Sequence, residues 1–291
     1  MRVTVCANLC ATLALACAAS LVAPLLAPLV APLAGAQTVQ YRSIAGVEHR
    51  AQVDTGAVAR AAASLASDPK NVDRIIALGL AQASVRQYKE AIATFSRGIA
   101  IAPANPILYR WRGHRYISTG DPARALADLE KGNTLDTMNY DIWYHLGVAH
   151  FLRGEFPAAA DAFAHCQRLA PNPNEVAGST DWLWMALSRA GRAADAQRAL
   201  APITDAFRVT TATAYFQRLQ LYKGVSNPDQ VITPADTADV QVATLSFGVG
   251  NWYLARGDAA NAKKWFQRSV ASGGWPGFGY FASEIELQRM K

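Results

Sequence analysis

Apolar and polar positions follow helical spacing along most of the chain, and from residue 72 onward the pattern repeats every 34 residues. Pro69, Pro103 and Pro171 mark this period, because 34 residues separate the first two and twice that number separates the last two. Three contiguous units follow, at residues 72–105, 106–139 and 140–173. A fixed period of this length indicates stacked helical hairpins, in which each unit contributes two antiparallel helices.

Small residues recur at two positions of each unit. A glycine lies in the first expected helix and an alanine in the second: Gly79, Gly113 and Gly147, with Ala91, Ala125 and Ala159. Antiparallel helices approach closely only where small side chains cross, so these positions are expected to lie opposite each other. Large side chains then fill the gaps between turns: Tyr88, Phe95, Phe156 and Phe163. A single unit cannot bury its apolar face, so the stack is expected to form one continuous core.

The pattern continues in weaker form outside these units. Degenerate units are predicted near residues 177–208 and 243–276, with a helix over 210–222 and a loop over 223–240 between them. A helix within 55–70 is expected to dock on the first unit, and a capping helix is predicted at 277–290. Residues 37–54 show no clear period and are expected to be mobile or to hold a partner. The predicted domain, residues 55–291, is an all-α, right-handed superhelix (an α-solenoid) of about five hairpin repeats without any sheet.

The first 36 residues have a different composition. They contain one Arg, no acidic residue, a long run of Ala, Leu and Val, and small residues at Ala34 and Ala36. This favours a secretory signal peptide cleaved after Ala36 and a periplasmic or secreted protein. A retained membrane-spanning helix is the alternative, but prolines would remove backbone donors that a helix in lipid needs: Pro24, Pro28 and Pro32. Lipid attachment at Cys17 is a third interpretation.

Charge and cysteine content narrow the function further. The chain has 28 basic and 22 acidic residues, and the basic ones are scattered among acids, which argues against a nucleic-acid-binding surface. Cleavage after Ala36 would remove three of the four cysteines, so only Cys166 would remain and no internal disulfide could form. Cys166 takes a small-residue position of the repeat, which favours a buried structural thiol over a reactive nucleophile.

Three common catalytic motifs are missing from the sequence, which weighs against the common hydrolases and nucleotide enzymes. It has no Gly-rich phosphate loop, no Gly-x-Ser-x-Gly elbow and no His-Glu-x-x-His. Four histidines fall in the second and third units, but they are expected to lie apart, so neither a metal nor another cofactor is predicted: His114, His145, His150 and His165. Trp143 is expected to be a core residue. Trp184 replaces the glycine of a crossing, so it should either open its unit or turn outward.

The recurring residues resemble the tetratricopeptide repeat, whose pattern is an aromatic residue, Leu-Gly, Tyr, Gly, Ala, Phe, Ala and Pro over one period. The third unit carries this pattern as Trp143, Leu146-Gly147, His150, Gly154, Ala159, Phe163, Cys166 and Pro171. A degenerate "WLWMAL" unit is followed by an apolar helix ending in Tyr222-Lys223-Gly224, an acidic spacer and a restored "NWYLARGDAANAKKWF" unit. With this order of features, residues 70–289 resemble the NlpI-like bacterial periplasmic tetratricopeptide lipoproteins. That resemblance implies an adaptor that brings proteases to cell-wall hydrolases and often dimerises. The context of Cys17 departs from the lipid-attachment pattern, so contact with a membrane is expected only if Cys17 is lipidated or the signal is retained.

The resemblance also implies a concave groove lined by the first helices. Their second, fifth and ninth positions would point into it: Asp73, Ile76 and Leu80, Ile107, Arg110 and His114, Asp141, Tyr144 and Val148, and Asp181 near the degenerate unit. Such a surface suits an extended or helical peptide, with Arg110 pairing with a carboxylate and Tyr144 acting as an anchor. Neither Arg110 nor Tyr144 is expected at a helix crossing. The basic pairs that grip a C-terminal carboxylate in chaperone-binding relatives are missing.

These observations favour a non-enzymatic scaffold or adaptor of the bacterial envelope that binds other proteins or peptides. An envelope protease or a cell-wall enzyme is the partner that the resemblance suggests, a homodimer is possible, and nucleic acid is not expected. A structural subunit that only oligomerises is the alternative. An enzyme with an unrecognised centre in residues 204–242 or in the N-terminal segment is the third hypothesis.

Overall fold

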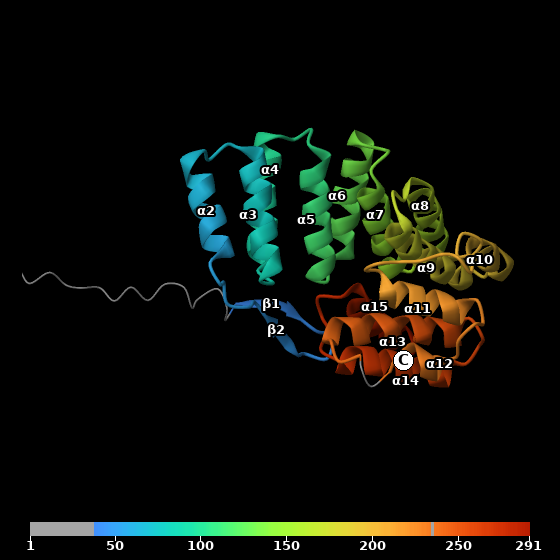
Figure 1. The fold of residues 1–291 in the computed structure, drawn as a ribbon. Helices are drawn as coiled ribbons and strands as arrows, with labels where there is room; N and C mark the ends of the chain where they lie inside the picture. The colour runs from blue at the N-terminus through green and yellow to red at the C-terminus, as the bar shows by residue number, and fades with distance from the viewer. Residues whose placement is uncertain (1–37, 234–235) are drawn as a thin grey trace, which may run out of the picture. The chain divides into compact units, whose positions relative to one another are not determined.

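The computed structural model describes residues 38–233 and 236–291, so the predicted signal peptide and Cys17 lie outside the described residues. The described chain is a stack of helices with one small ribbon of two strands (Figure 1). The first eight helices are α2 (Ala57–Ser67), α3 (Val72–Ser84), α4 (Tyr88–Ile101), α5 (Pro106–Ser118), α6 (Pro122–Leu135), α7 (Tyr140–Arg153), α8 (Phe156–Leu169) and α9 (Pro173–Arg189). They are followed by α10 (Ala193–Ala199), α11 (Thr213–Tyr222), α12 (Pro228–Val231), α13 (Asp239–Leu254), α14 (Ala259–Ala271) and α15 (Phe278–Arg289).

Three hairpins, α3–α4, α5–α6 and α7–α8, occupy the three predicted units. An asparagine begins the first helix of each, and its side chain accepts a backbone N–H of the first turn: Asn71, Asn105 and Asn139. The glycines lie at close crossings, as expected, but each faces a large side chain rather than the alanine alone. A Cβ atom on Gly147 would lie 2.7 Å from the ring of Phe163, and one on Gly79 would lie 2.4 Å from Phe95. The all-α repeat fold is confirmed.

The fourth unit departs from the hairpin pattern. Its second helix, α10, has only seven residues, and α11 packs against α9 in addition to α10. Trp184 is 2% exposed and stacks on Tyr222 of α11 with ring centroids 3.8 Å apart. Of the two outcomes expected for Trp184, the outward orientation is excluded: the ring points inward, because the added helix α11 supplies a flat partner. A regular hairpin, α13–α14, then restores the pattern, and Phe266 fills the space over Gly250.

The N-terminal ribbon corrects the prediction of a fold without a sheet. Strands β1 (Val39–Arg42) and β2 (Glu48–Arg50) pair antiparallel, with Tyr41 opposite His49 and an irregularity between Val39 and Tyr41. The side chain of Gln40 accepts the backbone N–H of Lys89 at 2.8 Å, and the hydroxyl of Tyr41 donates to Glu284 at 2.5 Å. Residues 38–50 are thus an ordered element between α4 and α15.

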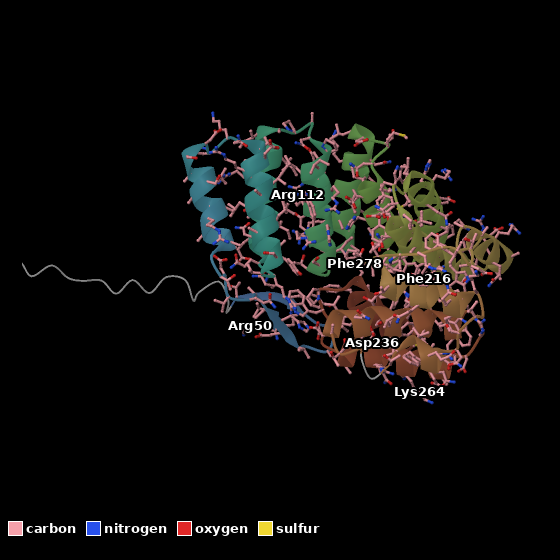
Figure 2. The ribbon with its side chains drawn as sticks, in the orientation of Figure 1. Arg50, Arg112, Phe216, Asp236, Lys264 and Phe278 are labelled. Carbon is pink, nitrogen blue, oxygen red and sulfur yellow. The ribbon has the colours of Figure 1, made fainter. Side chains whose placement is uncertain are left out.

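The C-terminal helix α15 packs beyond its own end of the stack. Besides α13 and α14, it contacts α5 and α7, which are first helices of the second and third units. The ring of Phe278 lies 5.2 Å from His114 and 5.7 Å from His145, and Figure 2 places Phe278 where these helices meet. At the other end of α15, Arg289 donates to the carbonyl of Leu152 at 2.9 Å. The helix that was expected to cap the stack therefore also covers part of the face lined by first helices.

Among residues 38–233 and 236–291, no helix is both long enough and apolar enough to cross a membrane.

Candidate protein-binding cleft

An open cleft remains where α15 does not reach, between α7, α9 and the start of α11. It has a volume of about 320 Å³. Its lining includes two residues predicted for the groove, Asp141 and Tyr144, and the full set is Tyr140, Asp141, Tyr144, His145, Asn174, Glu175, Gly178, Thr211, Ala212 and Tyr215. A second hollow of similar volume shares Thr211, Ala212 and Tyr215 and continues onto α13. We refer to the first hollow as the α7–α11 cleft.

Two tyrosines from different helices meet at the floor of the α7–α11 cleft. The hydroxyls of Tyr144 on α7 and Tyr215 on α11 lie 2.9 Å apart, within hydrogen-bond distance. Tyr144 also packs edge-on against Phe163 with centroids 5.9 Å apart, and burial raises its pKa well above the ordinary value. Gly178 of α9 leaves space beside them, because a Cβ atom there would meet both rings only at 3.7 Å. The floor of the cleft is thus formed by aromatic rings that are held in place, and the space beside Gly178 is not filled by another side chain.

The rim is held by a single amide side chain. Asn174 accepts the backbone N–H groups of Thr210, Thr211 and Ala212 at 2.9, 2.9 and 3.1 Å. These groups lie just before α11, whose first turn has no other side-chain cap. The segment entering α11 is therefore positioned by α9, and the rim needs little ordering before it contacts a partner.

Two carboxylates line the cleft, those of Asp141 and Glu175. Asp141 is half-exposed and lies 3.0 Å from Arg110, while a buried oxygen of Glu175 has no hydrogen-bond partner. No lysine or arginine lines this hollow. Together with the rings of Tyr140, Tyr144 and Tyr215, the carboxylates make a surface that suits a cationic side chain, because aromatic faces and carboxylates both attract positive charge.

Arg110 does not serve as the predicted free partner for a peptide carboxylate. It is 7% exposed, its guanidinium stacks on Trp111 at 3.6 Å, and Asp141 already neutralises it. Burial lowers its pKa, and two of its nitrogens have no hydrogen-bond partner. Arg110 is therefore buried and already paired, so it is not available to a peptide in the way that was predicted.

The two histidines on α5 and α7 do converge, contrary to the prediction for this pair. The rings of His114 and His145 lie 4.3 Å apart, and burial lowers the pKa of both well below the ordinary value. His150 instead contacts Glu155, and His165 stacks on Trp143. Within the described ranges no group of three or more His, Cys, Asp or Glu side chains could hold a metal ion. The His114–His145 pair is a neutral packed contact under Phe278.

Asp181 is not a groove residue. It is fully buried on α9 and forms an ion pair with Arg218 of α11, which also donates to the carbonyl of Thr244 on α13 at 2.9 Å. Burial raises the pKa of Asp181 to about 7, although Arg218 opposes this shift. This ion pair connects α9, α11 and α13 at the irregular fourth unit. Asp181 therefore has a structural role and not the binding role that was predicted for it.

The groove residues predicted on α3 lie outside the cleft. Asp73 is exposed, and Ile76 packs partly into the small core cluster of Ala91, Phe95 and Leu108. Leu80 is half-buried, and none of the three lines the α7–α11 cleft. Conversely, the repeat pattern does not indicate Asn174, Thr211 or Tyr215. Thr211 and Tyr215 belong to α11 and the residues just before it, which lie outside the period and offer no repeat position to compare.

Comparison with known proteins agrees with the hairpins in the middle of the chain. Residues 112–172 match the family model described as tetratricopeptide repeat. Residues 112–172 are therefore of the tetratricopeptide repeat type. The more specific likeness to the NlpI-like lipoproteins stays a prediction.

Two curated relatives share such repeats over part of their length. The chain is 30% identical over 91 residues to the heat-shock protein cognate co-chaperone sgt12 of Aspergillus fumigatus, covering 31% of this chain and 27% of that protein. It is 36% identical over 110 residues to the Hsp70-Hsp90 organizing protein of Triticum aestivum, covering 38% of this chain and 19% of that protein. The chain thus spans about a quarter or less of either relative.

Solved tetratricopeptide repeat structures are also similar. One is YrrB, described as having an unusual peptide-binding site, at 13% identity and a TM-score of 0.47, covering 74% of this chain and 93% of that one. Another is MamA, at 17% identity and a TM-score of 0.45, covering 59% of this chain and 85% of that one.

Proposed function

We propose that this protein is a non-enzymatic interaction scaffold that binds a segment of a partner protein in the α7–α11 cleft. The observation that carries the proposal is the unfilled hollow beside Gly178, on the part of the first-helix face that α15 leaves open. Protein binding is also what the names of the co-chaperone relatives imply for proteins built on such repeats. A subunit that only oligomerises would not need this hollow.

The chemistry of the cleft indicates a basic segment. A lysine or arginine side chain placed over Tyr144 and Tyr215 would reach the carboxylates of Asp141 and Glu175. Each such contact contributes about 0.5–2 kcal/mol, depending on how far water is excluded. This preference is opposite to the sequence-based expectation that Arg110 binds a carboxylate.

Two synthetic peptides of identical apolar pattern test the proposal, one with arginines and one with glutamates at the central positions. The full chain should bind the arginine peptide more tightly, as measured by fluorescence anisotropy. Glu175→Gln should weaken this binding, whereas Glu130→Gln, an exposed carboxylate on α6, should leave it unchanged. Equal affinity of the two peptides, or equal effects of the two variants, would refute the basic-segment proposal.

Filling the cleft separates binding from folding. Gly178→Ala adds a methyl group that makes ordinary contacts and should raise helix stability by up to about 1 kcal/mol. It should also weaken peptide binding about threefold or more, because the methyl occupies the space between the two tyrosines. The matched control is Gly132→Ala on α6, where an added Cβ finds similar room at 3.4 Å and no cleft. Unchanged binding in Gly178→Ala would place the partner elsewhere.

We also propose that the protein acts in the bacterial envelope, where an exported protease or cell-wall enzyme is the candidate partner. The composition of residues 1–36 supports this proposal, with cleavage after Ala36. N-terminal sequencing of the protein from an envelope fraction should start at Gln37. A lipid-modified Cys17 or an intact residue 1 would show a membrane-anchored form instead.

A further inference from the structure

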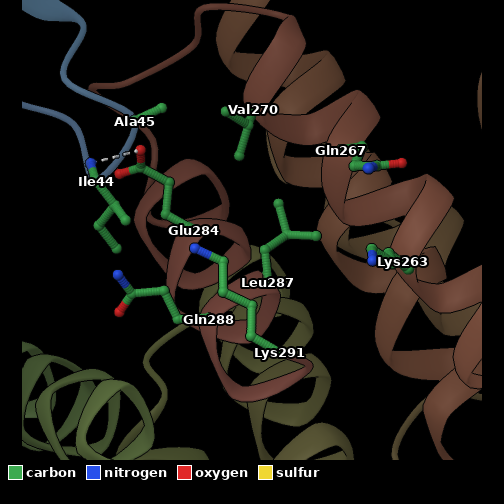
Figure 3. Close-up of a pocket in the computed structure, with 9 residues that line it drawn as sticks. All are labelled: Ile44, Ala45, Lys263, Gln267, Val270, Glu284, Leu287, Gln288 and Lys291. Carbon is green, nitrogen blue, oxygen red and sulfur yellow. Dashed lines mark hydrogen bonds between the residues drawn. The ribbon is translucent and has the colours of Figure 1, made fainter.

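A separate groove lies on another face of the molecule, between the turn of the ribbon, α14 and α15 (Figure 3). It has a volume of about 270 Å³. The ribbon turn contributes Ile44 and Ala45, and the remaining lining is Lys263, Gln267, Val270, Glu284, Leu287, Gln288 and Lys291. We refer to this hollow as the ribbon groove. It shares no residue with the α7–α11 cleft.

Apolar side chains remain accessible to solvent in the ribbon groove. Ile44 is 44% exposed at the tip of the ribbon, and Val270 and Leu287 are only half-buried on the two helices. A single exposed isoleucine would need no explanation, but three apolar side chains facing one hollow form a small apolar patch. Figure 3 shows Ile44 on the ribbon side of the hollow, with Val270 and Leu287 projecting from the two helices that border it.

The ribbon turn is held in place before any partner arrives. The backbone N–H of Ile44 donates to Glu284 at 3.2 Å, and Ser43 and Val47 close the turn with a hydrogen bond of 2.8 Å. Gly46 adopts a φ of +86°, in the left-handed region that glycine accepts without strain. A preformed groove avoids much of the ordering cost of binding.

The accessible charge around the ribbon groove is positive. Helix α14 contains Lys263, Lys264 and Arg268 and no acidic residue. Lys263 and Lys291 form no ion pair among the residues that the structure describes. The carboxylates of α15 are buried and engaged: Glu284 with Tyr41 and Ile44, and Glu286 with Arg189 and Arg289.

We infer that the ribbon groove binds an acidic segment of another protein, which inserts one or two apolar side chains between Ile44 and Leu287. The carboxylates of that segment would meet Lys263 and Lys291 at the rim. The volume lies just below the range of about 300–1,000 Å³ that is usual for small-molecule sites, and it suits anchor side chains of a protein. The opposite charge of the two hollows lets one chain hold a basic segment and an acidic segment at once.

Two labelled synthetic peptides test this inference, with the same helical spacing of leucines and either glutamate or lysine at all other positions. The full chain should bind the glutamate peptide about tenfold more tightly, and added salt should weaken this binding because the lysines are exposed. Binding of the arginine peptide to the α7–α11 cleft is measured in parallel, so the two proposals can fail independently.

Neighbouring residues supply matched controls. Ile44→Asp and Lys263→Glu should each lower the affinity for the glutamate peptide about tenfold, because they introduce negative charge into the groove. Val47→Asp and Lys264→Glu should change this affinity by less than about twofold. Val47 is 54% exposed in the same turn but does not line the groove, and Lys264 is on the outer side of α14 at the lower edge of Figure 2. Circular dichroism checks that all four variants are folded.

Several outcomes would overturn the inference. Equal binding of the two peptides, or no binding of the glutamate peptide at millimolar concentration, would show that the groove does not select an acidic segment. An equal loss of affinity in the control variants would show that binding depends only on the net charge of the protein. Sedimentation showing a dimer that Ile44→Asp dissociates would make a second copy the occupant. Binding to phosphatidylglycerol vesicles that Lys263→Glu abolishes, without binding of the glutamate peptide, would identify a lipid surface instead.

Discussion

Single side chains decide how closely the paired helices approach. At three crossings a glycine faces the ring or branched end of one large residue, and the nearest atoms leave no room for a methyl group: Gly79 with Phe95, Gly113 with Leu129 and Gly147 with Phe163. The repeat pattern shows the glycines, but it does not show which residue fills the space, since that depends on the rotation of each helix. The alanines predicted as partners lie one turn earlier.

Gly147→Ala is expected to destabilise the protein. A Cβ atom 2.7 Å from the ring of Phe163 forces the hairpin apart, and overfilling of this kind costs about 1–3 kcal/mol, partly offset by the helix preference of alanine. Denaturant unfolding should show a lower midpoint than in the wild type. Gly132→Ala serves as the control and should be neutral or stabilising; equal midpoints in the two variants would show that the crossing can relax.

The buried histidines should make stability depend on pH. Burial, with Arg110 and Arg115 nearby, holds the pKa of His114 and His145 well below 6.5 in the folded protein. Below pH 6.5 the unfolded chain takes up protons that the folded chain cannot, so stability falls as the pH falls, by up to about 1.4 kcal/mol per pH unit for each proton. His114→Phe should flatten this dependence in thermal unfolding between about pH 7 and pH 5. His165→Gln should flatten it less, because this exposed ring has a pKa that is lowered but not far below the ordinary value.

The helical hairpins could be predicted from the sequence, but the strands could not. The hairpins α3–α4, α5–α6 and α7–α8 could be predicted because small and large residues recur in phase. The ribbon could not, because strands of four and three residues with mixed polarity carry no period, and their order depends on distant partners such as Glu284. Helix α15 was predicted as an element, but its contact with α5 and α7 was not, because local pattern does not encode where a terminal helix docks.

Removing the ring that docks α15 should loosen the helices beneath it. Phe278→Ala deletes the contact with His114 and His145 and should cost about 2–4 kcal/mol, less than a fully buried phenylalanine because Phe278 is partly exposed. Hydrogen exchange should become faster in α5 and α7 as well as in α15. Faster exchange confined to α15 would show that the helix is an independent cap.

On the scale of the whole described chain, burial is unevenly distributed. The largest apolar cluster runs from Tyr116 to Ala282, whereas the clusters around Leu65 and Phe95 contain only three buried residues each. In repeat proteins stability is roughly a sum over units and their interfaces, so a unit with a small core opens at lower cost. The candidate cleft belongs to the well-packed part, which explains why groove residues predicted near the first repeat have no counterpart in it.

Unfolding should therefore begin at the N-terminal helices. Amide hydrogen exchange of the full chain should proceed faster in α2 and α3 than in α7, α9 and α13. Leu78→Ala in the small cluster should speed exchange in α2 and α3 and leave α9 unchanged, since no shared core connects them. Uniform exchange across all these helices would indicate one cooperative unit.

The ribbon has a mechanical consequence. An open stack of hairpins stretches and twists like a spring, because each repeat touches only its neighbours. Here Gln40 is bonded to α4 and Tyr41 to α15, while Tyr88 of α4 packs edge-on against Trp275 just before α15. These ties join the first hairpin to the C-terminal helix α15. The curvature of the stack is therefore fixed before a partner binds. When the protein is pulled, the ribbon contacts should break before the repeats separate from one another.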